Sequence, residues 1–307
     1  MEVSSAVKEF LAAKRQLSPY TRRSYKQRLG VFASWCKQHD LVLESMTARA
    51  VRAFLQDVSK RTGPQGKPIQ NSTLRVYGTA VKTFLAWCAK ESEDLDAAIS
   101  PTISARVGTI PVEMKVIQTF TPSQISALFA AAEQGTFAVR DKAILAVFVD
   151  TGARVSEVVG LTLDCVWLEA DDSYILVKGK GKKQREIALG RVARLALRRY
   201  VTRYRRPAHP GEPHVFLARG DHPITVSGLS QLIVHLGQKA GITGVRCSCH
   251  TFRHGYACAC LLAGNDVYKV SRLMGHTSVK VTERYLGAVK AKQARDGAYS
   301  VLDHLKS

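Results

Sequence analysis

The chain has 307 residues, 46% of them hydrophobic, and its 45 Lys and Arg exceed its 25 Asp and Glu to give a net charge of +20. That length is enough to bury a sizeable core and favours about two domains, while the hydrophobic content excludes a disordered chain. The longest apolar runs, such as AILAVFV, are far too short to span a bilayer.

The amino terminus and the cysteines indicate the compartment. The segment MEVSSAVKEF mixes acidic and basic residues and lacks the apolar core of a signal peptide, so a cytoplasmic location is expected. The seven cysteines are expected to stay reduced there, and their odd number and irregular spacing give no disulfide framework.

The positive charge is spread over the whole chain. Residues 1–110 have a net charge of +8 and residues 111–307 one of +12. A basic tail would concentrate the excess at one end, so two folded parts that both contact a polyanion explain the distribution better. A ribosomal-type or merely soluble basic protein is the alternative, but binding to DNA or RNA is favoured.

Residues 1–95 are predicted to form a helical domain. Ser18 and Pro19 are an N-cap and N1 pair that begins a helix, and apolar residues follow at helical spacing. Two later segments, around residues 51–58 and 74–88, repeat this spacing. A solvated basic face is the ordinary explanation for the charges off these apolar faces, but contact with a duplex explains them better. These candidates are Arg22, Arg23, Lys26, Arg75 and Lys82.

The helical periodicity lapses between residues 96 and 118, where we predict an interdomain linker. A helix is expected to restart with Thr121 as N-cap and Pro122 at N1. Helices dominate the remainder, residues 119–307, apart from three short strands expected between about residues 165 and 190. The predicted fold class is therefore mainly α with a small antiparallel β-sheet.

Four separated stretches of the second domain carry unusual polar residues: TGARVSEVVGL, VKGKGKKQREIAL, HTFRH and LMGHTSVKVTERYLG. Singly, each has an ordinary explanation, such as a surface arginine, a flexible glycine turn or a packed tyrosine. The GKG turn is not a phosphate-binding P-loop, because the GxxxxGK[ST] frame is absent. The candidate residues in these stretches are Arg154, Glu157, Lys180, His250, Arg253, His276 and Tyr285.

Together and in this order, the four stretches resemble the tyrosine recombinase (phage integrase) family, most closely its simple Xer-like members. The shared pattern is TGxRxxE, a hairpin GKG, HxxRH and GH, with Tyr285 nine residues after His276. The resemblance covers nearly the whole chain and implies a SAM-like helical core-binding domain followed by a catalytic domain. It also implies a site-specific DNA recombinase that cleaves and rejoins double-stranded core sites through a 3′-phosphotyrosine intermediate, in integration, excision or resolution.

The resemblance assigns the proton transfers to three residues. A tyrosine has a pKa near about 10 and needs help to attack at neutral pH. By resemblance, Tyr285 is the nucleophile, His250 is the general base, and Lys180 protonates the departing 5′-oxygen. Its neighbours in the hairpin are further DNA-binding candidates, namely Lys178, Lys182 and Lys183.

The remaining motif residues are implied to hold the phosphate. Arg154 and Arg253 supply permanently charged donor forks that stabilise charge growing in the transition state. His276 would hydrogen-bond the phosphate, and Glu157 would support the geometry. The phosphotyrosine bond retains the energy of the phosphodiester, so neither a cofactor nor a metal is expected.

The cysteine-rich segment CSCHTFRHGYACAC raises the alternative of a zinc site. Its cysteines occur as CxC pairs, which is not the usual spacing of structural zinc ligands. Cys258 and Cys260 would also lie on different faces of a helix. The histidine and arginine of the segment are assigned to phosphate chemistry by the resemblance, so the two cysteines are interpreted as packing residues.

The residues after the proposed nucleophile bear on assembly. Tyr299, Leu302 and Leu305 form an apolar stripe, and packing of that stripe within its own subunit is the ordinary explanation. In relatives a C-terminal helix reaches into the neighbouring subunit, so the resemblance implies a homotetramer on synapsed DNA through residues 292–305. A type IB topoisomerase-like enzyme without strand exchange and a DNA-binding regulator are the competing functions.

Overall fold

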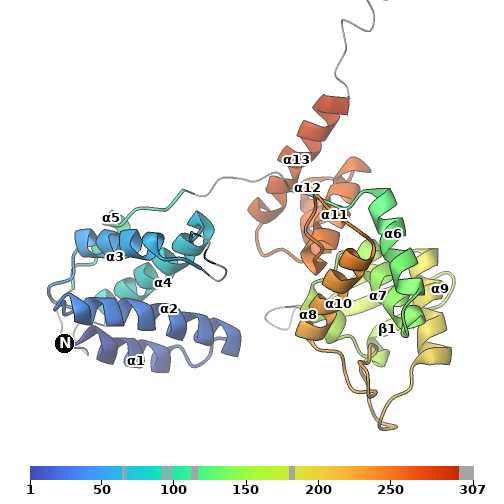
Figure 1. Cartoon of the computed structure of the whole chain (residues 1–307), viewed down its shortest axis with the longest axis horizontal. Helices are drawn as coiled ribbons and strands as arrows, with labels where there is room; N and C mark the ends of the chain where they lie inside the picture. The colour runs from blue at the N-terminus through green and yellow to red at the C-terminus, as the bar shows by residue number, and fades with distance from the viewer. Residues whose placement is uncertain are drawn as a thin grey trace, which may run out of the picture. The chain divides into compact units, whose positions relative to one another are not determined.

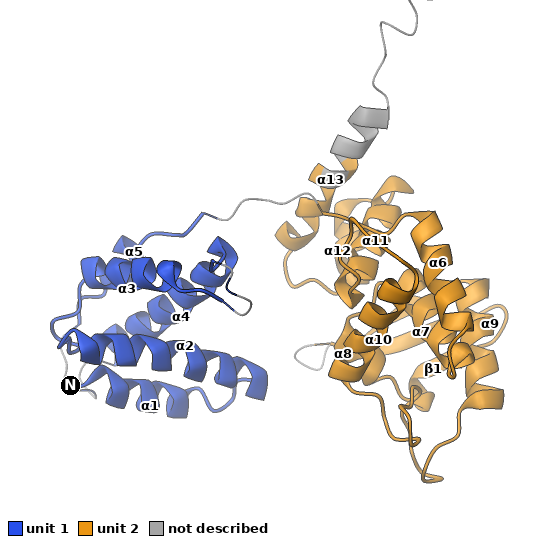
Figure 2. Ribbon diagram, in the orientation of Figure 1, with its two compact units in different colours: residues 1–115 blue, residues 116–307 orange. Residues whose placement is uncertain are grey.

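The structure is a computed structural model that describes residues 1–296 apart from 64–65, 67, 92–94, 96–98, 112–116 and 180–183. The chain divides into two compact units, Met1–Lys115 and Val116–Ser307, which Figure 2 colours separately. Each unit has a hydrophobic core of its own. No helix within the described ranges is long and apolar enough to cross a membrane.

The first unit is built from helices (Figure 1). The predicted start of its second helix is confirmed: Ser18 Oγ accepts a hydrogen bond from the backbone N–H of Thr21, and Pro19 is the first helical residue. Proline is well tolerated there because the first N–H groups of a helix have no partner within it. The helices are α1 (Val3–Ala13), α2 (Pro19–Gln38), α3 (Ala48–Lys60), α4 (Asn71–Lys90) and α5 (Ile103–Arg106).

Four phenylalanines, one from each long helix, form the centre of this first core. Phe10, Phe32, Phe54 and Phe84 are fully buried. The rings of Phe10 and Phe84 meet edge to face at 5.7 Å, and those of Phe32 and Phe54 at 4.9 Å. Such pairs stabilise a core beyond the area that they bury, so the four helices share one well-defined centre.

The segment predicted to be a linker, residues 96–118, belongs in part to the first unit. Ile99 and Ile103 are buried in its core. Arg52 donates to the carbonyl of Arg106 at 2.8 Å, and Lys82 donates to the carbonyl of Gly108 at 3.0 Å. Two isoleucines four positions apart thus pack in the first core even though proline and glycine interrupt the segment, and the linker itself stays a prediction.

The second unit combines eight described α-helices, a 3-10 helix (Leu163–Cys165) and a π-helical turn (Tyr200–Tyr204) with one small sheet. Strands β1 (Val166–Leu168), β2 (Ser173–Lys178) and β3 (Gln184–Ala188) pair antiparallel in the order β1-β2-β3. The predicted fold class, mainly α with a small antiparallel sheet, is confirmed. The helices are α6 (Pro122–Glu133), α7 (Ala138–Thr151), α8 (Val155–Val159), α9 (Arg191–Arg199), α10 (Val226–Lys239), α11 (Cys249–Leu262), α12 (Val267–Met274) and α13 (Lys280–Asp296).

Helix α7 is the centre of the larger core of this unit. Its residues 143–148 are buried on every side, which is typical of a helix enclosed by other elements. Phe148 of α7 stacks on Phe252 of α11 at 5.8 Å. This contact fixes α11, the helix that carries the HTFRH stretch, against the core.

A smaller cluster joins α11, α12 and α13, which lie together in Figure 1. Met274 and Tyr285 are fully buried in it. The packing therefore brings the tyrosine of the last motif beside the helix that bears the HTFRH stretch.

Candidate active site

The turn between α7 and α8 requires a glycine. Gly152 ends α7 with a left-handed φ of 55°, and a Cβ at this position would lie 2.7 Å from the Tyr256 ring. The turn makes Arg154 the N-cap residue of α8. Its backbone N–H donates to Glu157 Oε2 at 2.7 Å, so the carboxylate closes the first turn of the short helix.

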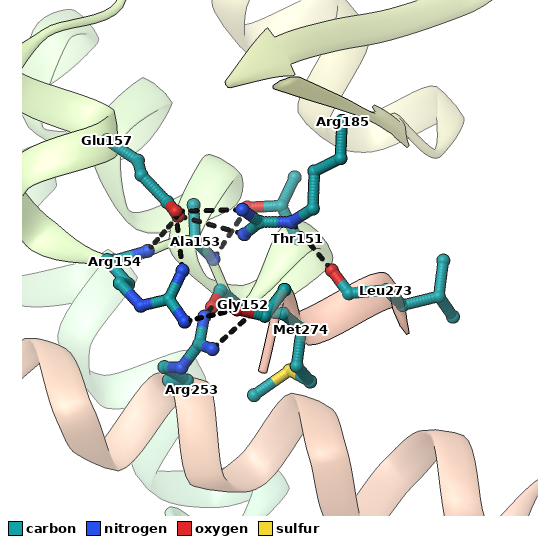
Figure 3. A network of polar contacts seen from close by, with 10 residues as sticks. Thr151, Gly152, Ala153, Arg154, Glu157, Arg185, Arg253, Leu273 and Met274 are labelled. Carbon is teal, nitrogen blue, oxygen red and sulfur yellow. Dashed lines mark hydrogen bonds and ion pairs between the residues drawn. The ribbon is translucent and has the colours of Figure 1, made fainter. Parts of the chain in front are cut away.

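Glu157 is the buried anion of the site. Its side chain receives Arg154 Nη1 at 2.8 Å and both terminal nitrogens of Arg185 at 2.8 and 2.9 Å (Figure 3). Burial alone would raise the pKa of Glu157, but the hydrogen bonds from Arg185 and from the Arg154 backbone outweigh it and hold the pKa below its usual value. The carboxylate is therefore ionised and fixes two guanidinium groups.

Three arginines donate to three consecutive carbonyls at the C-terminus of α12. Arg185 Nε bonds the carbonyl of Leu273 at 2.9 Å, and Arg154 Nη2 bonds that of Gly275 at 2.6 Å. Arg253 Nη2 bonds the carbonyl between them, that of Met274 (Figure 3). The last carbonyls of a helix have no intrahelical partners and carry partial negative charge, so they suit cationic donors.

Arg253 lies deepest in this arrangement, with 5% of its surface exposed. Its Nη1 donates to the carbonyl of Gly152 at 2.8 Å, which connects α11 to the turn before Arg154. Burial, and then the nearby charge of Arg154, lower the pKa of Arg253 to about 10. The guanidinium thus remains charged at neutral pH, and two of its five N–H groups are used by the protein.

A cleft of about 930 Å³ opens beside the arginines. It is bordered by α8, the end of β2, the start of β3 and the turn after α12. Its charged and titratable lining residues are Arg154, Glu157, Lys178, Arg185, Arg272 and His276. Four permanent cations and one paired carboxylate give the cleft a positive potential suited to an anionic ligand.

Tyr285 lies on α13 behind this cleft, with 1% of its surface exposed. Its ring is parallel to that of His276, which lines the cleft, at a centroid distance of 6.4 Å. Its hydroxyl lies 2.8 Å from Nδ1 of His254 and 3.3 Å from Nη2 of Arg284. The tyrosine is thus close to the arginine cluster but enclosed by the protein.

The two histidines of the HTFRH stretch have different surroundings. His254 is half-buried and contacts the Tyr285 hydroxyl, whereas His250 is exposed and faces the ring of His254 at 6.0 Å. Burial, followed by the charge of Arg284, lowers the pKa of His254 to about 4. Partial burial and the charge of Arg253 also lower the pKa of His250. Both imidazoles are therefore neutral at pH 7.

His276 is oriented by a buried threonine. Its Nδ1 lies 2.7 Å from Oγ1 of Thr282, which is fully buried one turn before Tyr285. Burial, and then the charge of Arg253, lower the pKa of His276 to about 4. The contact fixes one ring nitrogen and leaves the other available to the cleft.

The hairpin and the carboxyl terminus are only partly described. Lys178 is exposed at the end of β2, where it lines the cleft. Three hairpin candidates, Lys180, Lys182 and Lys183, lie outside the described residues. The proposed tail anchors lie outside them as well, namely Tyr299, Leu302 and Leu305.

The basic candidates of the first unit occupy α2 and α4. Arg22, Arg23, Lys26 and Arg75 are exposed, whereas Lys82 is half-buried and bonds the Gly108 carbonyl. A groove of about 460 Å³ runs between these two helices and is lined in part by Arg75. Four of the five candidates are therefore accessible to a ligand.

The cysteine-rich segment, residues 247–260, begins just before α11 and forms all of this helix except its last two residues. Cys249 is buried, and Cys258 and Cys260 pack half-buried against the α11–α13 cluster. Within the ranges that the structure describes, no three His, Cys, Asp or Glu side chains lie close enough to hold a metal ion.

Sequence reasoning assigned no role to Arg185 and Thr282, which the structure places at the site, and it linked His254 only to phosphate chemistry or its scaffolding and not to Tyr285. Arg185 had a detectable signal, because it shares a strand face with the buried Ile187, where a charged side chain is unusual. His254 and Thr282 have contacts that no spacing rule predicts, since each depends on how α11, α12 and α13 pack.

A cleft lined by guanidinium groups, with a tyrosine close behind it, indicates a protein of the phosphodiester-processing class. The sequence profile of the phage integrase family matches residues 118–292, and that of the phage integrase N-terminal SAM-like domain matches residues 7–92. The chain belongs to the phage integrase family, and the prediction of a tyrosine-type site-specific DNA recombinase is confirmed. The regulator and topoisomerase-like alternatives are not favoured.

Xer recombinases are among the similar proteins. Tyrosine recombinase XerC of Yersinia pestis is 27% identical over 278 residues, which cover 90% of this chain and 86% of that protein. Tyrosine recombinase XerD of Corynebacterium glutamicum is 27% identical over 283 residues, which cover 90% of each. The Xer-like resemblance is therefore confirmed.

Solved structures share the fold. XerH recombinase bound to its palindromic difH substrate has a TM-score of 0.72 and 16% identity, and the match covers 95% of this chain and 83% of that one. XerA recombinase has a TM-score of 0.51 and 24% identity, with 98% and 100% covered. At these identities the likeness concerns the architecture alone.

Proposed function

We propose that the recombination chemistry of this chain takes place in the cationic cleft, with Tyr285 as the nucleophile. The observation that carries the proposal is that Arg154 and Arg253 both bond the backbone directly before His276, whose ring lies parallel to that of Tyr285 at 6.4 Å. A phosphodiester bound there would meet permanent positive charge close to a tyrosine hydroxyl.

The two arginines would bind the non-bridging oxygens of the phosphate. Each donates two N–H groups to protein acceptors and has three others. Arg154 lines the cleft, whereas Arg253 is 5% exposed and would reach a phosphate only once the cleft opens towards it. Because the protein has already oriented both guanidinium groups, they would stabilise charge that grows in the transition state without reorganising. His276 would donate to a phosphate oxygen from the ring nitrogen that Thr282 does not contact.

The reaction would proceed by in-line displacement. The Tyr285 oxygen forms a bond to phosphorus, the bond from phosphorus to the 5′-oxygen breaks, and the leaving oxygen takes a proton from Lys180. The tyrosine proton passes to His250, the general base that the motif implies. Rejoining reverses these steps with the 5′-hydroxyl of another strand.

Tyr285 would have to leave its present surroundings before it attacks. Its hydroxyl is bonded to His254 and its side chain is almost fully buried, so a phosphate has no access to it. A shift of α13 towards the cleft would expose the hydroxyl and bring it near His250, whose exposed ring lies next to that of His254.

The remaining roles concern binding and assembly. We propose that residues 1–95 bind core DNA through Arg22, Arg23, Lys26 and Arg75, and that residues 119–307 catalyse. Residues 292–305 would join four subunits on synapsed DNA by exchange between neighbours, the arrangement implied by the family resemblance. A cytoplasmic location remains a prediction.

Selection of covalent adducts tests the function. The protein is incubated with a pool of nicked duplexes whose arms are randomised, and DNA that remains attached after denaturation is sequenced. Peptide mapping should place the attached nucleotide on Tyr285, and Tyr285→Phe should give no adduct while it binds the recovered duplex with nearly unchanged affinity. Attachment to Tyr256 or Tyr268 would refute the assignment.

A further inference from the structure

We propose that Arg185 is a positioning residue for recombination, which ties the base of the β2–β3 hairpin to Glu157 and through it holds Arg154 in place. The proposal rests on the proposed function, in which Arg154 contacts the reacting phosphate. The proposal gives a role to Arg185, which lies on β3 five positions after the motif residue Lys180.

The contacts of Arg185 connect three elements. From β3 it reaches Glu157 of α8 through both terminal nitrogens, at 2.8 and 2.9 Å, and the Leu273 carbonyl of α12 through Nε, at 2.9 Å. Only 14% of its side chain is exposed. A planar fork with donors on both edges fits these partners, whereas lysine offers a single charged point.

The backbone beside Arg185 is shaped to admit it. Gly275 has a left-handed φ of 61°, and a Cβ there would lie 2.8 Å from Arg185 Nη1. The absence of a side chain thus lets the guanidinium lie directly against the turn that precedes His276. Arg185 therefore contacts the Glu157 carboxylate, which holds Arg154, and the backbone that leads to His276.

Arg154 depends on the same carboxylate. Glu157 Oε1 accepts from both Arg154 Nη1 and Arg185 Nη1, so the two guanidinium groups lie on either side of one oxygen. Without Arg185, Glu157 would keep its burial but lose two of its donors. Its orientation, and hence that of Arg154, would no longer be fixed to β3.

This coupling predicts a pH signature that a merely structural residue would not produce. The carboxylate is faced by Arg154 from α8, by Arg185 from β3 and by Arg253 from α11. Loss of Arg185 removes the partner that lowers the pKa of Glu157 most, while burial of the carboxylate still raises it. The pKa of Glu157 therefore rises in the variant. Protonation in mildly acidic buffer would then release Arg154 and slow cleavage.

The experiment compares Arg185→Lys, Arg185→Gln and the double variant Arg185→Gln/Glu157→Gln with the full-length wild type. The matched control is Arg203→Gln, because Arg203 is exposed and has no charged partner within the described residues. The probe is the nicked duplex recovered in the adduct selection. Single-turnover adduct formation at saturating protein is measured from pH 5 to pH 8, together with DNA affinity and thermal unfolding.

We expect adduct formation to slow by about 10-fold in Arg185→Lys and about 100-fold in Arg185→Gln, because small misplacements of catalytic groups have effects of that size. The DNA affinity of these variants should change by less than about 3-fold, since most of the charged surface that contacts DNA remains. Arg185→Gln should show an extra loss of rate below neutral pH, and the double variant should be slow but lack that loss. Arg203→Gln should match the wild type.

Two results would overturn the proposal: wild-type rates in Arg185→Gln, or a slow variant whose pH profile keeps the wild-type shape. If Arg185→Gln does not fold, Arg185→Lys carries the test, since its rate must fall while its melting temperature stays near that of the wild type. Failure of the proposed function is distinguishable, because the wild type itself would then give no adduct at Tyr285.

Discussion

The hydroxyl of Tyr285 lies 2.8 Å from Nδ1 of His254, and this contact accompanies almost complete burial of the tyrosine. Because burial and then Arg284 lower the pKa of His254 to about 4, the imidazole is neutral at pH 7 and can accept a hydrogen bond from the hydroxyl. So low a pKa makes His254 a weak base. The contact therefore holds the tyrosine in place rather than activating it.

Replacement of that acceptor should loosen Tyr285. His254→Phe keeps a ring but removes the hydrogen bond, which is worth about 1 kcal/mol, so the exposed population of Tyr285 should rise about fivefold. Nitration by tetranitromethane, resolved by peptide mass spectrometry, measures this exposure. Tyr268, which is 68% exposed, is the internal reference and should react equally in both proteins. Unchanged nitration of Tyr285 would show that packing alone buries it.

The turn before Arg154 should not tolerate a side chain. Gly152→Ala adds a Cβ 2.7 Å from the Tyr256 ring at a φ of 55°, so strain and overpacking together should destabilise the protein by about 2 to 5 kcal/mol. Urea denaturation measures the loss. Gly287→Ala is the matched control, because nothing lies within 4 Å of that position in α13 and alanine favours a helix. Equal stability of the two variants would contradict the role of Gly152.

Local signals in the sequence predicted much of the fold. Ser18 and Pro19 cap α2, and Thr121 and Pro122 cap α6 with a capping box. Each signal acts within one helical turn and so survives any tertiary arrangement. The packing of Ile103 on the first unit escaped prediction because its partners on α3 and α4 lie far away in the sequence.

The site was predictable where motifs carry it and not where packing creates it. Arg154 and Arg253 both reach the turn after α12, as their shared role in the motif requires. The partners of Arg185, by contrast, lie 28 and 88 positions away in the chain. The one local indication of a role for Arg185 was its inward position on β3. The many lysines of the same hairpin made this single inward arginine hard to recognise.

The neutral histidines should make the protein less stable in mild acid. His254 and His276 have folded-state pKa values of about 4, below the usual 6.5. The unfolded chain therefore binds more protons between these values, and this contribution to stability is complete above about pH 7 and is lost as the pH falls towards 4. Unfolding near pH 5 should therefore bind about two protons, nearly one at each of these two histidines.

Denaturant unfolding at a series of pH values measures that uptake as the slope of the unfolding free energy. His254→Gln should reduce the slope by about one proton, although it also lowers stability at pH 7. An identical slope in His254→Gln would mean that His254 is protonated in the folded protein.

Catalysis should survive chelation. In the proposed site Arg154 and Arg253 neutralise the phosphate charge and the neutral His276 donates a hydrogen bond, so cleavage of the selected duplex in EDTA should proceed within about twofold of the rate in magnesium, as expected when guanidinium donors supply the electrostatic stabilisation. Adduct formation after exhaustive dialysis against EDTA measures this. A loss of cleavage that added zinc or magnesium restores would overturn the mechanism.

DNA affinity should fall steeply with salt, and the exposed arginines of α2 should account for part of that slope. Each guanidinium that neutralises a phosphate releases a condensed counterion, so the logarithm of affinity falls linearly with the logarithm of salt concentration. Arg22→Gln/Arg23→Gln should make the slope less negative by about two, roughly one for each lost contact. Fluorescence anisotropy with the selected duplex between about 50 and 300 mM salt covers the range in which counterion release dominates. Arg61→Gln is the control, because Arg61 is exposed but already paired with Asp57 at 3.2 Å, and its slope should match the wild type. A double variant with the wild-type slope would place the DNA on another face of the first unit.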